Sequence, residues 1–210
     1  MAEPLLTSLP MMARIGILTG TFDPVHEGHV AVARVVRQQC GLESVWFWPN
    51  ARPAHKVPVA DLGARLAMLQ LALSDEAFLE VAPLEVNDFD QPHTLEYFTE
   101  VLARFGGQEF VFIVGEDTLS GLDTWRDVES VVNNTSYIMV QRPGAPTHSL
   151  TDLRQRLGDL GTSLRVEVVQ APLVYNVSST AIRQSLSCSR QPAGLHPLVA
   201  QYARSVGFYS

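Results

Sequence analysis

Two histidines, His26 and His29, stand three positions apart in the segment GTFDPVHEGH, residues 20–29. At the start of a helix this spacing lets both imidazoles face one side and donate hydrogen bonds to phosphate oxygens. Gly28 removes a side chain from the face that a ligand would approach, and Gly20 permits a sharp backbone turn. The pattern favours an anion site. The alternative is that one histidine caps the helix and the other packs in the core.

A second group of anion-binding residue types lies near the other end of the chain. Ser178 and Ser179 precede a predicted helix, whose first hydroxyls and N–H groups can bind anions, and Arg183 follows on the same face. Asp117 comes directly after a buried predicted strand and Gly115, where its carboxylate could accept hydrogen bonds from ribose hydroxyls. Taken singly, the serines and Asp117 are equally consistent with helix caps, and Arg183 with a solvated side chain.

Strands and helices alternate along the chain and must position these residues. Short β-branched apolar segments predict strands, and apolar residues at helical spacing predict helices. The predicted strands cover residues 14–19, 44–48, 79–82, 109–114, 136–140 and 165–169. The predicted helices cover residues 27–40, 61–73 and 94–105, with shorter ones around Asp127 and Leu150 and two that begin at Ser179 and Pro197.

This alternation predicts an α/β fold, a Rossmann-like parallel sheet with helices on both faces whose C-terminal helices carry the serine and arginine motif. In such sheets ligands bind outside the carboxyl ends of the strands, where the strand order reverses. We therefore expect the candidate residues to meet at that edge. We expect a single domain over residues 14–210, preceded by a loose N-terminal extension over residues 1–13.

The composition narrows the class of protein. Hydrophobic residues make up 46% of the 210 residues and charged residues 18%, which is enough apolar material for a buried core. The net charge of −7 argues against sequence-blind nucleic-acid binding. No apolar run approaches the roughly 20 residues of a membrane-spanning helix, so no membrane partner is expected. Cys40 and Cys188 lie far apart, which indicates free thiols and a cytoplasmic protein.

Four motifs together resemble the HxGH nucleotidyltransferase superfamily, and within it the nicotinate (or nicotinamide) mononucleotide adenylyltransferases. The first is GTFDPVHEGH at residues 20–29, and the second is PNARPAHK at residues 49–56, similar to the family's PNxxPPHK loop. The third is FIVGEDTL at residues 112–119 with Trp125, and the fourth is VSSTAIR at residues 177–183, similar to ISSTxIR. Their order and spread make the resemblance far more specific than HxGH alone.

The resemblance implies adenylyl transfer from ATP to a pyridine mononucleotide, which gives a dinucleotide and pyrophosphate in NAD biosynthesis. The mononucleotide phosphate is already an anion, so the protein must align two phosphates and offset charge rather than supply a strong base. The implied catalytic residues are His26, His29 and Arg183, and the implied cofactor is Mg²⁺ bound through the ATP phosphates, without protein ligands. The implied ATP-binding residues are Gly20, Thr21, Phe22, His26, Gly28, His29, Gly115, Asp117, Ser178, Ser179 and Arg183. The implied mononucleotide-binding residues are Asn50, His55, Lys56, Thr94, Trp125 and Arg126.

Only a few residues bear on which mononucleotide receives the adenylyl group. The family's SYTxxTL motif corresponds here to DQPHTL at residues 90–95, which keeps only the final Thr-Leu. Trp125 offers a flat face for a pyridine ring, with ordinary core packing as the alternative. Arg126 could pair with a nicotinate carboxylate or form a surface ion pair with Asp123 or Glu129. We expect nicotinate mononucleotide as the acceptor, with nicotinamide mononucleotide as the alternative.

Two other functions share parts of this pattern. Another HxGH transferase, such as a pantetheine-phosphate adenylyltransferase or a cytidylyltransferase, would use the same phosphate machinery. A non-catalytic nucleotide sensor would use the same fold, but it could dispense with His29 or Arg183, and this chain keeps both. The partners we expect are small molecules in each case, and the protein is either a monomer or a homo-oligomer.

Overall fold

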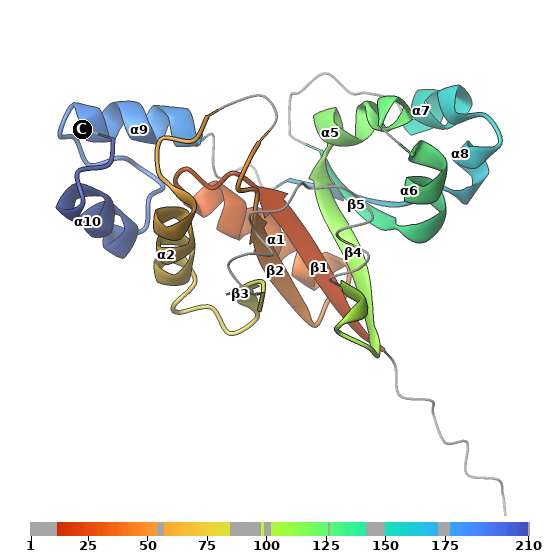
Figure 1. Ribbon diagram of the computed structural model, residues 1–210, viewed down its shortest axis with the longest axis horizontal. Coiled ribbons are helices and arrows are strands. Elements are labelled where there is room, and N and C mark those ends of the chain that lie inside the picture. The colour runs from red at the N-terminus through yellow and green to blue at the C-terminus, as the bar shows by residue number, and fades with distance from the viewer. Residues whose placement is uncertain are drawn as a thin grey trace, which may run out of the picture.

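The computed structural model describes residues 12–53, 57–84, 98, 102–125, 127–141, 150–171 and 177–209. In these ranges six parallel strands form one sheet in the order β3-β2-β1-β4-β5-β6 (Figure 1). The strands are β1 (Ala13–Gly20), β2 (Ser44–Pro49), β3 (Leu79–Val81), β4 (Gln108–Gly115), β5 (Ser136–Gln141) and β6 (Arg165–Gln170). The predicted Rossmann-like α/β fold is confirmed.

Helices precede or follow most of these strands, as the alternation predicts. They are α1 (Glu27–Gln39), α2 (Leu62–Ala72), α5 (Glu116–Ser120), the 3-10 helix η1 (Leu122–Thr124), α6 (Val128–Asn134), α7 (Leu150–Leu157), α8 (Leu160–Ser163), α9 (Ser179–Ser187) and α10 (Pro197–Ser205). The Asp61 carboxylate accepts from the Ala64 amide and caps α2, and the Ser178 hydroxyl accepts from the Ala181 amide and caps α9.

The strand order reverses between β1 and β4. From β1 the chain adds β2 and β3 on one side, and from β4 it adds β5 and β6 on the other. The register pairs Gly20 with Pro49 and Leu18 with Ile113, so the carboxyl ends of β1, β2 and β4 lie nearly level. The loops that follow β1 and β4 therefore flank the point at which open parallel sheets bind ligands.

Hydrophobic clusters cover both faces of the sheet. On one face Leu18 and Phe47 pack with residues of α1, α2, α9 and α10, including Val36, Met68 and Ala203. On the other face Ile17, Trp46 and Trp48 pack with Phe98 and Leu102, and a separate cluster joins β5 to α6 and α7. Trp46 and Trp48 are nearly or fully buried, so these two tryptophans serve packing.

The observed elements differ from the sequence-based prediction in small ways. Strand β1 begins at Ala13, inside the expected extension, because Ala13 pairs with Gln108 of β4. The short helices α5, η1 and α8 were not predicted from the sequence. They are only three to five residues long, too short to show a periodic pattern of apolar residues. Of the helix predicted over residues 94–105, only Phe98, Leu102 and Ala103 are described as helical. In the described ranges, no helix combines the length and the hydropathy needed to cross a bilayer.

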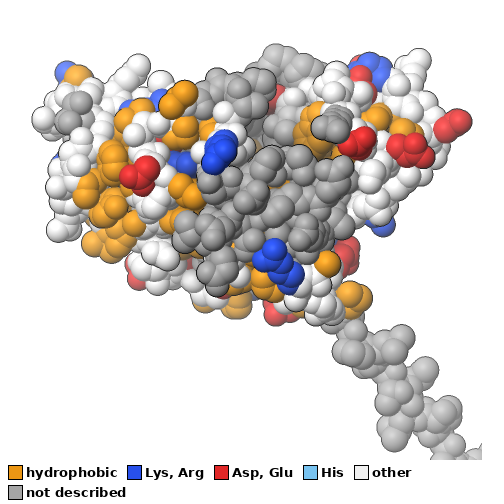
Figure 2. Space-filling view, in the orientation of Figure 1, with side chains coloured by type: hydrophobic (Ala, Val, Ile, Leu, Met, Phe, Trp, Pro, Cys, Tyr) orange, Lys and Arg blue, Asp and Glu red, His pale blue; other side chains and the backbone are white. Residues whose placement is uncertain are grey.

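Charge is distributed unevenly on the face shown in Figure 2. Acidic side chains gather over the end of the molecule that carries α5 to α8, whereas Lys and Arg side chains are scattered singly on this face.

Candidate active site

The loop after β1 turns sharply and buries the first of its side chains. Phe22 has a positive φ of 51°, and its ring folds back against Gly20, where an added Cβ would lie 2.8 Å from ring atoms. The ring is buried in the core, so the backbone of Phe22, rather than its side chain, is left to meet a ligand. The peptide bond between Asp23 and Pro24 is cis.

The two histidines of the loop are brought together as the spacing predicts. Their rings stack with centroids 3.7 Å apart and an angle of 23° between the planes. The His26 backbone N–H donates to Nδ1 of His29 at 3.2 Å, so in the neutral ring the proton sits on Nε2. The edge of His29 also meets the Phe22 ring, at a centroid distance of 5.0 Å. These contacts orient His29 as an Nε2–H donor.

Two backbone amides at the start of α1 are already hydrogen-bonded within the protein. The Glu27 N–H donates to the carbonyl of Gly194 at 2.8 Å, and the His29 N–H donates to the carbonyl of His26 at 2.9 Å. Among the described residues, the Gly28 amide in the first turn has no such acceptor. The start of α1 is therefore only partly open to a ligand, because a distant segment of the chain folds back onto it.

Helix α9 contacts the loop after β1 through two bonds whose partners lie 155 and 160 residues apart in the chain. The Ser179 hydroxyl donates to the Pro24 carbonyl at 2.9 Å, and Nη1 of Arg183 donates to the Asp23 carbonyl at 2.7 Å. The Ser178 hydroxyl caps α9, which is the helix-cap role named above as the alternative to anion binding. Ser179 instead links α9 to the loop. Two side chains of the second motif therefore bind the backbone of the loop that carries the two histidines.

The loop after β2 is tied to the same place. The Asn50 N–H donates to the carbonyl of Gly20 at 2.7 Å, which continues the β1–β2 pairing beyond the sheet. The Asn50 side-chain oxygen accepts from the Arg52 N–H at 3.1 Å and so shapes the loop itself. The positions predicted to contact the mononucleotide at His55 and Lys56 lie outside the described residues.

A buried arginine that the sequence analysis did not single out holds these two loops together. Arg65 of α2 is 1% exposed, and its guanidinium donates to the carbonyls of Thr21 at 2.8 Å, Asn50 at 2.7 Å, Ala51 at 3.2 Å and Ala60 at 3.2 Å. Burial lowers the pKa of Arg65, and the nearby Asp23 carboxylate opposes that change. The sequence contained one sign that Arg65 is buried, because Arg65 lies on the apolar face of α2 with Met68 and Leu69.

Gly115 and Asp117 lie at the end of β4, next to the point where the strand order reverses. A Cβ added to Gly115, whose φ of −72° suits any residue, would meet no described atom within 4 Å. Asp117 is exposed in the first turn of α5, where a ligand can reach its carboxylate. Its neighbour Glu116 is buried and accepts from the Gln141 side-chain amide at 3.3 Å. Of the two carboxylates, Asp117, which was predicted to bind a ligand, is therefore the accessible one.

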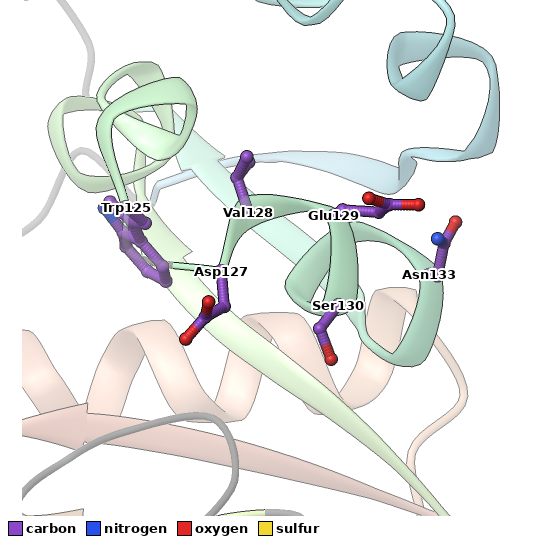
Figure 3. Close-up of a pocket in the computed structure, with 6 residues that line it drawn as sticks. All are labelled: Trp125, Asp127, Val128, Glu129, Ser130 and Asn133. Carbon is purple, nitrogen blue, oxygen red and sulfur yellow. The ribbon is translucent and has the colours of Figure 1, made fainter.

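Trp125 is 39% exposed, more than a core tryptophan would be. It lies at one end of an open depression whose other walls are Asp127 and α6, with Glu129 and Asn133 at the far end (Figure 3). The side chain of Asp123 is bound by Arg156 in two hydrogen bonds of 2.8 and 3.0 Å, which lowers the pKa of that carboxyl. Asp123, one of the two surface ion-pair partners considered for Arg126, is therefore already paired with Arg156. Arg126 and Thr94 themselves lie outside the described residues.

Known proteins resemble the chain in both sequence and fold. Residues 17–185 match the family described as cytidylyltransferase-like. A probable nicotinate-nucleotide adenylyltransferase of Symbiobacterium thermophilum is 37% identical over 82% of this chain and 83% of its own length, and one of Neisseria gonorrhoeae is 32% identical over 94% and 99%. The chain belongs to the nicotinate-nucleotide adenylyltransferase family. The resemblance drawn from the four motifs is confirmed.

Solved structures support the fold of this nicotinate-nucleotide adenylyltransferase family member. The nicotinic acid mononucleotide adenylyltransferase of Plasmodium falciparum, complexed with NaAD, superposes with a TM-score of 0.72 at 17% identity, over 93% of this chain and 97% of that one. At this low sequence identity the match shows that the two proteins share a fold, and no more. The family model begins within β1 and ends within α9, so it contains the β1 loop, the β4 end and Arg183.

Proposed function

We propose that this protein transfers the adenylyl group of ATP to nicotinate mononucleotide, releasing pyrophosphate and the dinucleotide on the route to NAD. The observation that carries this proposal is the binding of Ser179 and Arg183 to the loop that carries His29, beside the point where the strand order reverses. The relatives named as nicotinate-nucleotide adenylyltransferases and the related structure complexed with NaAD support the acceptor.

The reaction requires that the two phosphates be aligned and that the negative charge on their oxygens be stabilised. The acceptor phosphate attacks the α-phosphorus of ATP, the bond to the β-phosphate oxygen breaks, and pyrophosphate leaves with that electron pair. His29 donates from Nε2 and Arg183 from its guanidinium to phosphate oxygens on which negative charge accumulates, and the Gly28 amide adds a donor from the backbone. His26 stacks on His29 and holds its orientation.

ATP and Mg²⁺ complete the proposal. A related structure is complexed with APC, which supports a nucleoside triphosphate site in this fold. Among the described residues no three His, Cys, Asp or Glu side chains are grouped as a metal site. Mg²⁺ that arrives on the ATP phosphates needs no such cage and lowers the charge of the leaving pyrophosphate. The two free cysteines suit the reducing cytoplasm in which we place the enzyme.

The test is pyrophosphate release by the purified protein with ATP and Mg²⁺. Nicotinate mononucleotide, nicotinamide mononucleotide and phosphopantetheine are supplied in separate reactions, and the product is identified by mass. We expect the highest kcat/KM with nicotinate mononucleotide and no turnover after EDTA treatment. Turnover with phosphopantetheine alone would reassign the enzyme within its superfamily, and ATP binding without pyrophosphate release would indicate a sensor.

A further inference from the structure

The penultimate residue of the chain reaches the loop that follows β1. The hydroxyl of Tyr209 donates to Oδ1 of Asp23 at 2.7 Å, and the two residues are 6% and 5% exposed. The same carboxylate accepts from the Val59 N–H at 2.8 Å and the Ala60 N–H at 3.1 Å. Three donors from two distant segments therefore hold the Asp23 side chain in a buried position.

The end of α10 is shaped to deliver this hydroxyl. Gly207, with a φ of 75°, turns the chain back after the helix, and the Phe208 N–H donates to the carbonyl of Ala203 at 3.0 Å. Tyr209 then takes a φ of 67°, a conformation that costs free energy for a residue with a large side chain. The burial of its ring and the hydrogen bond to Asp23 offset that cost.

Asp23 lies between Tyr209 and Arg183 and could compete with a ligand for the guanidinium. Nη1 of Arg183 donates to the Asp23 backbone carbonyl at 2.7 Å but is 3.9 Å from Oδ2 of its carboxylate. A carboxylate that lost the Tyr209 hydroxyl would be less restrained, and it would attract the guanidinium into a closer ion pair. Arg65 adds a second positive charge on the buried side of Asp23.

We propose that Tyr209 is a positioning residue for the reaction: it restrains the Asp23 carboxylate so that Arg183 stays directed at the triphosphate of ATP. The role of Arg183 in this inference rests on the proposed function. Burial and the neighbouring Asp23 raise the pKa of Tyr209 above its ordinary value, so the hydroxyl remains a hydrogen-bond donor throughout the range in which enzymes are assayed.

The test compares Tyr209→Phe with a matched control, Tyr137→Phe. Tyr137 is equally buried and its hydroxyl is hydrogen-bonded with Thr135 at 2.8 Å, but it belongs to the cluster between β5 and α6. Both variants keep the apolar ring, and both should unfold at a lower temperature than the wild type. Only Tyr209→Phe should lower kcat/KM for ATP, by about 10-fold or more, since displaced reacting groups cost rate steeply.

Two further measurements separate positioning from general support of the fold. The affinity for ATP, measured by calorimetry, should fall about 10-fold in Tyr209→Phe and stay unchanged in Tyr137→Phe. In an Arg183→Ala background, Tyr209→Phe should cause no further loss of either quantity, because both changes act through one guanidinium.

Three results would overturn the inference. These are wild-type kinetics and ATP affinity in Tyr209→Phe, losses that match those of Tyr137→Phe, or additive losses in the double variant. Failure of the proposed function is a separate outcome, because it would appear as a wild-type protein that releases no pyrophosphate. The calorimetric comparison would then still decide whether Tyr209 acts on the ATP site.

Discussion

Replacing Arg65 with methionine should weaken both the fold and the reaction. The methionine keeps an unbranched apolar chain along α2 but removes a guanidinium that donates to four carbonyls and faces Asp23. Removing one partner of a buried charge interaction costs about 3–5 kcal/mol, because the remaining buried groups lose their compensation. For a chain of this size that corresponds to a fall in Tm of roughly 6–20 °C.

The loss of activity should exceed what unfolding explains. Arg65 links the loop after β1, at Thr21, to the loop after β2, at Asn50 and Ala51. Without it the two loops can separate, and a displacement of about 1 Å in a reacting group can cost about 100-fold in rate. Arg65→Lys should lose nearly as much, since an ammonium group keeps the charge but cannot reach several carbonyls in one plane.

The assay is urea denaturation followed by circular dichroism, with turnover measured at a temperature at which each variant is folded. Arg34→Met is the control, because Arg34 is an exposed arginine of α1 whose ion pair with Glu76 should contribute no more than about 1 kcal/mol. The reasoning is refuted if Arg65→Met is no less stable than Arg34→Met, or if it turns over at the wild-type rate.

Other consequences of the structure can be checked directly. His29→Ala should lower kcat about 10²- to 10³-fold, as expected for the loss of one transition-state donor, with circular dichroism to show an intact fold; a near-normal rate would remove His29 from the mechanism. Gly115→Val should raise KM for ATP at least about 10-fold while leaving Tm unchanged, because the added side chain would enter open space at the site. Burial and then the nearby Glu167 raise the pKa of Cys40 to about 11, which leaves roughly one thiolate in a thousand at pH 8. Exposed Cys188 should therefore react first with a thiol reagent, and equal rates for the two cysteines would contradict the placement of Cys40.

Most of the architecture could be predicted from local patterns. The apolar strands, the helical periodicity of α1 and α2, and the Asp61 and Ser178 caps are short-range features, because propensity and capping depend on residues a few positions apart. The short helices α5, η1 and α8 escaped prediction because packing, rather than periodicity, stabilises segments of that length.

The candidate site divides in the same way. The histidine pair, Arg183 and the accessible Asp117 could be predicted because their residue types and motifs carry the chemistry in the sequence itself. Arg65 and Tyr209 could not, since an arginine in a helix and a tyrosine near a chain end are ordinary until their partners are known.

The sequence by itself determined the family, the type of sheet and the residues that we propose bind phosphate. Only the tertiary structure decided that the Gly194 carbonyl occupies an amide of α1, that Arg65 holds two loops together and that Tyr209 restrains Asp23. The physical reason is the separation of the partners along the chain. A hydrogen bond between residues 23 and 209 leaves no periodic trace, and it forms only when packing brings these two distant segments together.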